Sequence, residues 1–180
     1  MTPRSMILVA LLAFGAFGAG GSLAEEPLAT GIGPDAQGRL PPAVQPPWPE
    51  RIPDYAQMDS ETGLHMTGEP QLIRVSDYVL RVEGEVERPL ELGYDDIRRL
   101  PRVGSRPTLV CEGFFVDLAS WAGASLAALL RLAGPKEGVR SITLVSADGY
   151  EMTVDVDLAT APEAYLAYEL EGHVLPILHG

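Results

Sequence analysis

The chain contains one cysteine, Cys111, in the stretch TLVCEGFF (108–115), where an apolar run of β-forming residues meets a glycine. A thiolate is a soft ligand for metals that also bind sulfur, and it is a nucleophile when its pKa is lowered. A free cysteine is also among the most buried residue types, and it packs as a small hydrophobe. From the residues alone, Cys111 is therefore a metal ligand, an intermolecular thiol or a buried bystander.

The chain contains three histidines. His179 lies next to the last residue, where a solvated side chain is the ordinary alternative to a functional one. His65 and His173 have no metal-ligand spacing to each other or to Cys111, so we expect both to be ordinary surface residues. A thiol nucleophile formed by Cys111 and His179 has no spacing signature to support it.

Residues 1–24 have the features of a secretory signal peptide. Arg4 precedes an apolar run from Met6 to Ala19, and the small residues Ser22 and Ala24 stand before Glu25. A helix of that run would be about 21 Å long, against a bilayer core of roughly 30 Å. We therefore expect cleavage after Ala24, a periplasmic or secreted mature chain and no stable membrane insertion, with an uncleaved anchor as the alternative.

Residues 25–59 are rich in proline and glycine without apolar periodicity, which predicts a linker or an extended arm. We expect the folded domain to span residues 60–180. Short strands dominate it, and one helix is clear because leucines recur on one face before Gly134 and Pro135. We predict a strand pair (77–92), a helical turn (93–101), strands on both sides of Gly113 (106–121), a helix (125–135), a hairpin (140–159) and a strand with a turn (163–180). This pattern indicates an α+β domain with a mixed β-sheet and few short helices. Within residues 106–121, Gly113 is expected to mark a bulge or a close approach by something else.

The charge balance is strongly acidic, with 13 lysines and arginines against 25 aspartates and glutamates and a net charge of −12. Such a chain repels phosphate backbones and anionic lipid surfaces. Nucleic acid is therefore not an expected partner.

Three segments occur in an order that resembles a known family. They are TLVCEGFFVDLASWAGASLAALLRLAGP (108–135), SITLVSADGYEMTVDVDLA (141–159) and YLAYELEGHVLPILHG (165–180), and the first contains Trp121 and Gly123 in a Trp-x-Gly-x-x-Leu pattern. Over about residues 70–180 the chain resembles the molybdopterin-binding domain of the sulfite oxidase superfamily. The resemblance implies a sulfite-oxidase-type fold, a molybdenum cofactor and two-electron oxygen-atom transfer.

The same resemblance implies roles for individual residues. Cys111 would be the thiolate ligand of molybdenum and the catalytic residue, His179 would contact the cofactor, and Ser146 or Asp148 would lie in a segment that reaches it. A plain Asp-Gly hairpin turn is the alternative for Ser146 and Asp148. The implied partners are a small-molecule substrate and a separate electron-transfer protein, because the sequence has no cysteine set for haem or for an iron–sulfur cluster.

Two departures from the family pattern affect this interpretation. The family domain continues past His-Gly with a Pro-x-Arg segment, further strands and basic residues for the pterin phosphate, so we expect this chain to be incomplete at its C-terminus and to bind the pterin weakly. Exported members commonly carry a twin-arginine signal, whereas Arg4 stands alone. The leading hypothesis is an exported molybdopterin-dependent oxidoreductase, and the alternative is a cofactor-free exported binding or interaction module that retains the fold.

Overall fold

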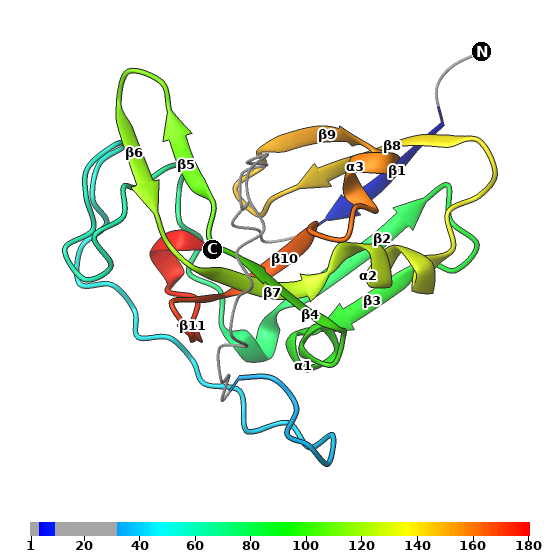
Figure 1. The fold of residues 1–180 in the computed structure, drawn as a ribbon, viewed down its shortest axis with the longest axis horizontal. Coiled ribbons are helices and arrows are strands. Elements are labelled where there is room, and N and C mark those ends of the chain that lie inside the picture. Colours follow the sequence, from blue (N-terminus) through cyan, green and yellow to red (C-terminus); the bar gives the residue numbers. More distant parts are fainter. Residues whose placement is uncertain (1–3, 10–31) are drawn as a thin grey trace.

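The computed structural model describes residues 4–9 and 32–180 (Figure 1). The helices are α1 (Tyr94–Arg98), α2 (Leu126–Ala133) and α3 (Val156–Ala159), with short 3-10 turns η1 (Val75–Asp77) and η2 (Ile177–His179). The strands are β1 (Arg4–Val9), β2 (Val79–Gly84), β3 (Leu90–Gly93), β4 (Arg102–Ser105), β5 (Thr108–Cys111), β6 (Phe115–Leu118), β7 (Trp121–Ser125), β8 (Val139–Val145), β9 (Glu151–Asp155), β10 (Tyr165–Leu170) and β11 (His173–Val174).

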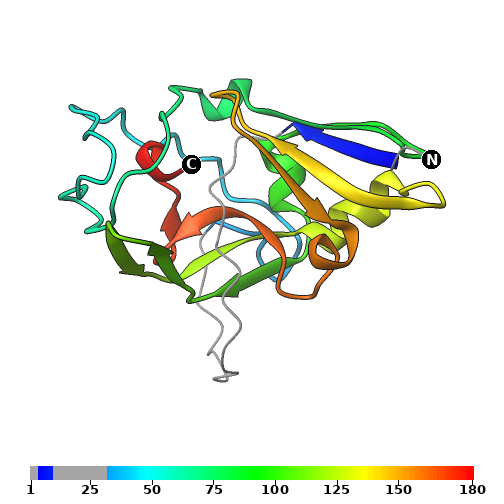
Figure 2. The ribbon, with the colours of Figure 1, turned by 90° about the horizontal axis from the view of Figure 1, so that it is seen from above.

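The strands form two larger sheets and a separate hairpin. One sheet has the order β3-β2-β1-β8-β9, with β1 parallel to β8, and the other has the antiparallel order β11-β10-β7-β4. Figure 2 shows these sheets as two layers with helices α1 and α2 between them. The expected α+β fold with a mixed sheet and few short helices is confirmed. β10 lies between β7 and the short strand β11, which pairs with it only at Glu169 and Leu170.

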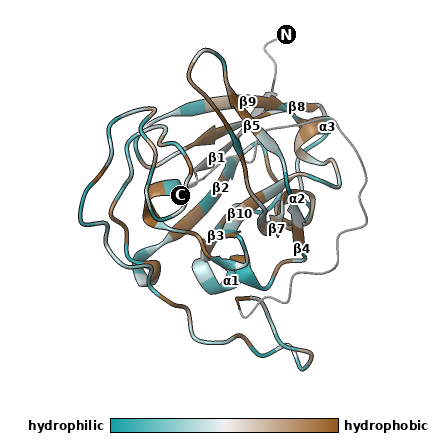
Figure 3. Cartoon of the chain, turned by 60° about the vertical axis from the view of Figure 1, so that its left-hand side comes forward, coloured by the Kyte–Doolittle hydropathy of each residue, from teal (hydrophilic) through white to brown (hydrophobic). Residues whose placement is uncertain are grey.

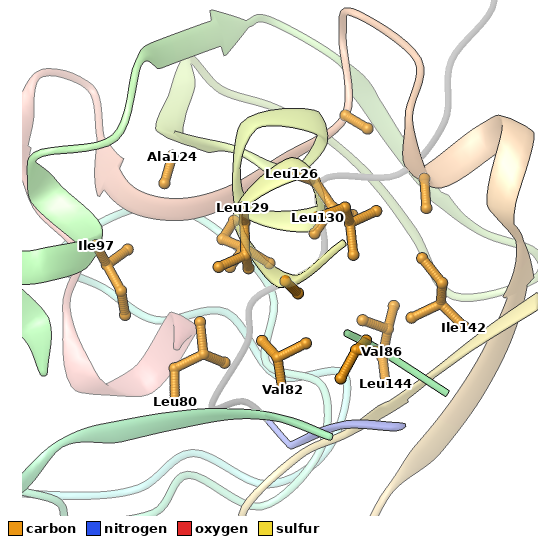
Figure 4. Close-up of a cluster of buried hydrophobic side chains, with 14 of the residues drawn as sticks. Leu80, Val82, Val86, Ile97, Ala124, Leu126, Leu129, Leu130, Ile142 and Leu144 are labelled. Carbon is orange, nitrogen blue, oxygen red and sulfur yellow. The ribbon is translucent and has the colours of Figure 1, made fainter. Parts of the chain in front are cut away.

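The main hydrophobic core surrounds α2. Ser125 caps this helix by accepting a hydrogen bond from the backbone N–H of Ala128, and Gly134 ends it in the left-handed conformation at φ 66°. Figure 4 shows the leucines of α2 above side chains from β2 and β8. This part of the core comprises Leu80, Val82, Leu126, Leu129, Leu130, Ile142 and Leu144.

Strand β7 is buried along its whole length and needs a glycine at position 123. A Cβ atom on Gly123 would lie 1.7 Å from the backbone oxygen of Leu166 on β10. The Trp-x-Gly pattern therefore has a packing reason, because only a residue without a side chain lets β7 and β10 approach this closely.

Strand β1 lies within the segment expected to be a signal peptide, of which only residues 4–9 are described. It pairs with β2 on one side, through Met6 opposite Gly84, and with β8 on the other, through Met6 opposite Ile142. Cleavage after Ala24 would remove this central strand. The facing edges of β2 and β8 would then lose their hydrogen-bond partners, which is costly for strands inside a sheet.

The proline-rich arm is described from residue 32 onward and lies against the domain. Ile32 is 7% exposed and belongs to the main core. The buried side chain of Arg98 holds the arm, since its guanidinium donates to the carbonyl of Ile32 at 2.8 Å and to that of Pro41 at 2.9 Å. Between residues 32 and 59 the chain is thus an ordered extended segment rather than a free tether.

Strands β5 and β6 form a hairpin that projects beside the C-terminal turn η2 (Figure 1). Gly113 was expected to mark a bulge or a close backbone approach inside a strand. It is a turn residue instead, with φ 81° and open space around its α-carbon. The outer face of the hairpin is apolar, as Figure 3 indicates by colour, and exposes Val110, Phe114, Val116 and Leu118.

Candidate functional site

The inner face of the β5–β6 hairpin borders a pocket of about 930 Å³. Cys111 is the last residue of β5, as predicted, and its half-buried side chain lines this pocket. His179 comes from η2, and Ser146 and Asp148 come from the turn between β8 and β9. The structure therefore brings all the predicted site residues around one cavity, within the size range of ligand sites.

The thiol of Cys111 contacts a residue of the arm. The hydroxyl of Tyr55 lies 3.7 Å from Sγ of Cys111, and the Tyr55 ring meets the edge of Phe114 with its centroid 5.9 Å away. The hydrogen bond to Cys111 raises the pKa of Tyr55. Sequence reasoning missed Tyr55 because a proline-rich segment carries no periodic signal that would place it against the site.

His179 is buried, so the alternative of a solvated chain end is wrong. Its side chain is 6% exposed, and Nε2 lies 3.1 Å from Oδ2 of Asp59 and 2.8 Å from Oγ1 of Thr62. Burial lowers the pKa of His179 despite the nearby carboxylate. Burial would raise the pKa of Asp59, but hydrogen bonds from Glu61, Thr62 and His179 together hold it below its usual value. A neutral imidazole anchored to an ionised carboxylate therefore forms one wall of the pocket.

Ser146 and Asp148 are held by the hairpin turn itself. The Ser146 hydroxyl donates to Oδ1 of Asp148, which also accepts from the backbone N–H of Tyr150 at 2.9 Å. The hydrogen bond from Ser146, followed by that from Tyr150, lowers the pKa of Asp148. These contacts are those expected of a plain Asp-Gly turn, yet both side chains line the pocket beside Cys111 and could also reach a ligand.

His65 was expected to be an ordinary surface residue, and this expectation is wrong. Its side chain is 21% exposed and lines the pocket, with Nδ1 2.7 Å from Oδ1 of the buried Asp117. The ring stacks on Phe115 at a centroid distance of 4.5 Å. The sequence signal was indirect, since Asp117 follows the hairpin turn on an inward-facing position of β6 and is too polar to be buried without a partner.

One buried group in the pocket wall has an unmet hydrogen bond. Trp121 is 4% exposed and lines the pocket, and its indole N–H has no partner. An orphaned donor and a soft thiol in the lining of one pocket fit a ligand with both a metal and polar heteroatoms, such as a molybdenum–pterin group. Within the described lining, however, the charged side chains are Glu69, Asp117 and Asp148, and no lysine or arginine faces a phosphate. The described lining therefore offers a thiol that could bind a metal, but no basic side chain that could bind a phosphate.

Three other features are not found in the part of the chain that the structure describes: a cluster of metal ligands, a hydrogen-bonded cysteine–histidine pair and a membrane-spanning helix. No cluster of three or more histidine, cysteine, aspartate or glutamate side chains is placed to hold a metal ion there. No hydrogen bond joins Cys111 to a histidine, because the thiol contacts Tyr55 and the His179 ring contacts Asp59 and Thr62. Across residues 4–9 and 32–180, no helix is long and apolar enough to cross a membrane.

Three curated proteins show sequence similarity to this chain. Sulfite oxidase of Arabidopsis thaliana is 30% identical over 147 residues, covering 62% of this chain and 37% of that protein. The uncharacterized oxidoreductase YuiH of Bacillus subtilis is 27% identical over 132 residues, covering 72% of this chain and 67% of that protein. A putative protein-methionine-sulfoxide reductase subunit, YedZ1 of Azospira oryzae, is 24% identical and covers 60% of this chain and 41% of that protein. The chain thus spans only about a third to two thirds of the length of these relatives.

The fold is also similar to a solved structure. The sulfane dehydrogenase SoxCD from Paracoccus pantotrophus superposes with a TM-score of 0.56 at 21% identity, covering 62% of this chain and 33% of that chain. The family model described as the oxidoreductase molybdopterin binding domain matches residues 66–180, which include Cys111, Trp121 and His179. The chain belongs to the oxidoreductase molybdopterin-binding domain family, within the sulfite oxidase superfamily.

Proposed function

We propose that this chain is the cofactor-binding part of an exported molybdopterin-dependent oxidoreductase, in which Cys111 is the protein ligand of molybdenum. The observation that carries the proposal is the position of the thiol. It ends strand β5 and lines a pocket of about 930 Å³ together with the buried, unpartnered indole N–H of Trp121. A soft ligand and a free donor in one cavity suit a metal that is already bound to sulfur.

A bound molybdenum cofactor would supply two-electron exchange of an oxygen atom with a small substrate. The residues of this chain would orient that group. Cys111 would bind the metal, Trp121 would donate its indole N–H, and the anchored His179 would contact the pterin. The turn residues Ser146 and Asp148, which line the same pocket, would offer further hydrogen-bonding groups.

Export, the compartment and the redox partner belong to the proposal. The support for export is the signal-like sequence of residues 1–24, which predicts a periplasmic or secreted protein. Cys111 is the single cysteine of this sequence, so any iron–sulfur cluster or covalent haem lies outside it, and we propose a separate electron-transfer protein as its carrier. The substrate is a small molecule that gains or loses one oxygen atom.

One observation favours the second candidate, a cofactor-free exported binding or interaction module. The charged residues of the described pocket lining are acidic, and a pterin phosphate placed beside them would meet repulsion rather than charge-assisted donors. In that case Cys111 would remain a free thiol in contact with Tyr55.

Molybdenum content separates the two candidates. The protein is produced in cells that make the cofactor, and metal is measured per chain in the wild type and in a Cys111→Ser variant. The His173→Asn variant is the matched control, because this histidine is exposed on β11 and does not line the pocket. Metal in the wild type and the control but not in Cys111→Ser supports the proposal. Absence of metal from all three, with normal folding, supports the cofactor-free module.

A further inference from the structure

The pocket holds a second histidine that the family pattern did not lead us to expect. On the hairpin, Cys111 stands opposite Phe115 and Leu109 stands opposite Asp117, so all four side chains lie on the inner face. His65 stacks on Phe115, the residue directly across from the thiol. Because Cβ atoms of such cross-strand neighbours lie about 5 Å apart, the ring on which His65 stacks is a direct neighbour of Cys111.

Asp117 fixes the orientation of this imidazole from two directions. Its Oδ1 contacts Nδ1 of His65 at 2.7 Å, and its Oδ2 accepts a hydrogen bond from the backbone N–H of His65 at 2.7 Å. Phe115 holds the ring plane, with an angle of 3° between the two rings. An ionised carboxylate accepts only, so a neutral His65 carries its proton on Nδ1 and leaves Nε2 as a bare acceptor.

Nε2 of His65 has no partner among the described residues, in contrast to Nε2 of His179, which both Asp59 and Thr62 engage. We propose that His65 is the proton-transfer residue of this pocket, and that Asp117 is the positioning residue that orients it. This proposal rests on the proposed oxidoreductase function.

Proton balance gives the reaction a need for such a residue. Removing one oxygen atom from a substrate as water breaks one bond to oxygen, forms two O–H bonds and consumes two protons and two electrons. A bound molybdenum cofactor would supply the two-electron exchange with a separate electron-transfer protein. The opposite reaction releases two protons and two electrons along the same routes. In either direction Nε2 of His65 would take up or give one of these protons, and the other would be exchanged with solvent.

Other titratable groups border the same pocket and must be separated from His65 in any pH profile. They are Tyr55 on the arm, Glu69 before η1, Cys111 and Asp117 on the hairpin, Asp148 and Tyr150 at the β8–β9 turn, and His179 on η2. His65 differs from them in combining an imidazole, a fixed ring and a free nitrogen.

The variant His65→Asn, compared with the control His173→Asn, separates the anchoring role of His65 from proton transfer. His65→Asn keeps an N–H donor near the position of Nδ1, so the contact with Asp117 is retained while Nε2 is lost. His173→Asn is the control on the exposed strand β11. Turnover is measured per bound molybdenum as a function of pH, with sulfite and ferricyanide in one direction and methionine sulfoxide and reduced benzyl viologen in the other. We expect His65→Asn to lower kcat about 100-fold or more with little change in KM, since general acid–base groups contribute about 10²–10⁴-fold.

A measurement on the cofactor-free chain gives an independent readout. ¹⁵N NMR of the neutral imidazole form of His65 should show the proton on Nδ1 and a bare Nε2, and Asp117→Asn should shift this tautomer. A His65→Asn variant with the wild-type kcat and pH profile, or a neutral His65 whose single proton lies on Nε2, would overturn the proton-transfer role. Absence of molybdenum and activity from the wild type, with the tautomer as expected, would instead overturn the proposed function.

Discussion

Replacing Gly123 by alanine should destabilise the protein strongly, although alanine adds a single methyl group. The new Cβ would lie 1.7 Å from the carbonyl oxygen of Leu166, 2.4 Å from its carbonyl carbon and 2.6 Å from the α-carbon of Ala167. These are all backbone atoms of β10, so no side chain can rotate away. Strand β10 must move by more than 1 Å, at a cost we place at about 3 kcal/mol, the upper end for overpacking. For a chain of this size this corresponds to a fall in Tm of about 6–12 °C.

Thermal unfolding followed by circular dichroism tests this, with Gly104→Ala as the graded control. A Cβ on Gly104 would lie 3.1 Å from the Cβ of Ala122 and 3.1 Å from the carbonyl oxygen of Trp121, so a shift of a few tenths of an ångström would relieve it. We expect a fall in Tm of only about 2–4 °C for this variant. If Gly123→Ala unfolded within 2 °C of the wild type, the close approach of β7 and β10 would be refuted as the reason for the glycine.

Three further predictions concern charge, pH and the N-terminal strand. Arg102→Met should lower the free energy of unfolding by about 3–5 kcal/mol, measured by urea denaturation, because it leaves the fully buried carboxylate of Glu169 without the guanidinium that contacts it at 2.8 Å; a loss below 1 kcal/mol would contradict this. In the folded chain the pKa of His179 lies below its usual 6.5 and that of Asp59 below its usual 3.8. On acidification the unfolded chain therefore binds each of these protons before the folded chain does. The free energy of unfolding should fall as the pH drops through about 6.5 and again below about 3.8. Urea denaturation at several pH values should show that His179→Asn removes the first step, and an unchanged profile would argue against it. If processing after Ala24 removes β1, hydrogen exchange should show that the amides of β2 and β8 that face β1 become unprotected. Full protection of these amides in the processed chain would show that another segment takes the place of β1 between the two strands.

The sequence was sufficient to predict those helices and strands whose ends are marked by neighbouring residues. The leucine spacing and Gly134 predicted α2, and Asp148-Gly149 predicted the β8–β9 hairpin. These signals are local because a helix cap and a short hairpin turn are decided by neighbouring residues. Gly113 was misassigned for the same reason, since a positive φ is needed both in a bulge and in a turn, and only the pairing of β5 with β6 distinguishes them.

The site could be predicted only in part because much of it depends on contacts between distant segments. Cys111 and His179 were found from the family resemblance, which covers the domain. His65 and Asp59 come from the region around the domain boundary, and each is positioned by a partner more than 50 residues away. No spacing pattern encodes such pairs. Their burial is visible only once the arm lies against the hairpin and η2.

The most direct test of the central claim is molybdenum K-edge X-ray absorption on the protein loaded with cofactor. We expect the loaded fraction to be well below one per chain, because the described pocket lining offers the pterin phosphate none of the charge-assisted donors that contribute about 1.5–3 kcal/mol each. Absorption reports the ligands of whatever metal is bound, so low occupancy does not obscure the result. If Cys111 is the protein ligand, Cys111→Ser should show one sulfur scatterer fewer around molybdenum than the wild type, and His173→Asn should show no change. An unchanged number of sulfur ligands in Cys111→Ser would contradict the assignment of Cys111 to the metal.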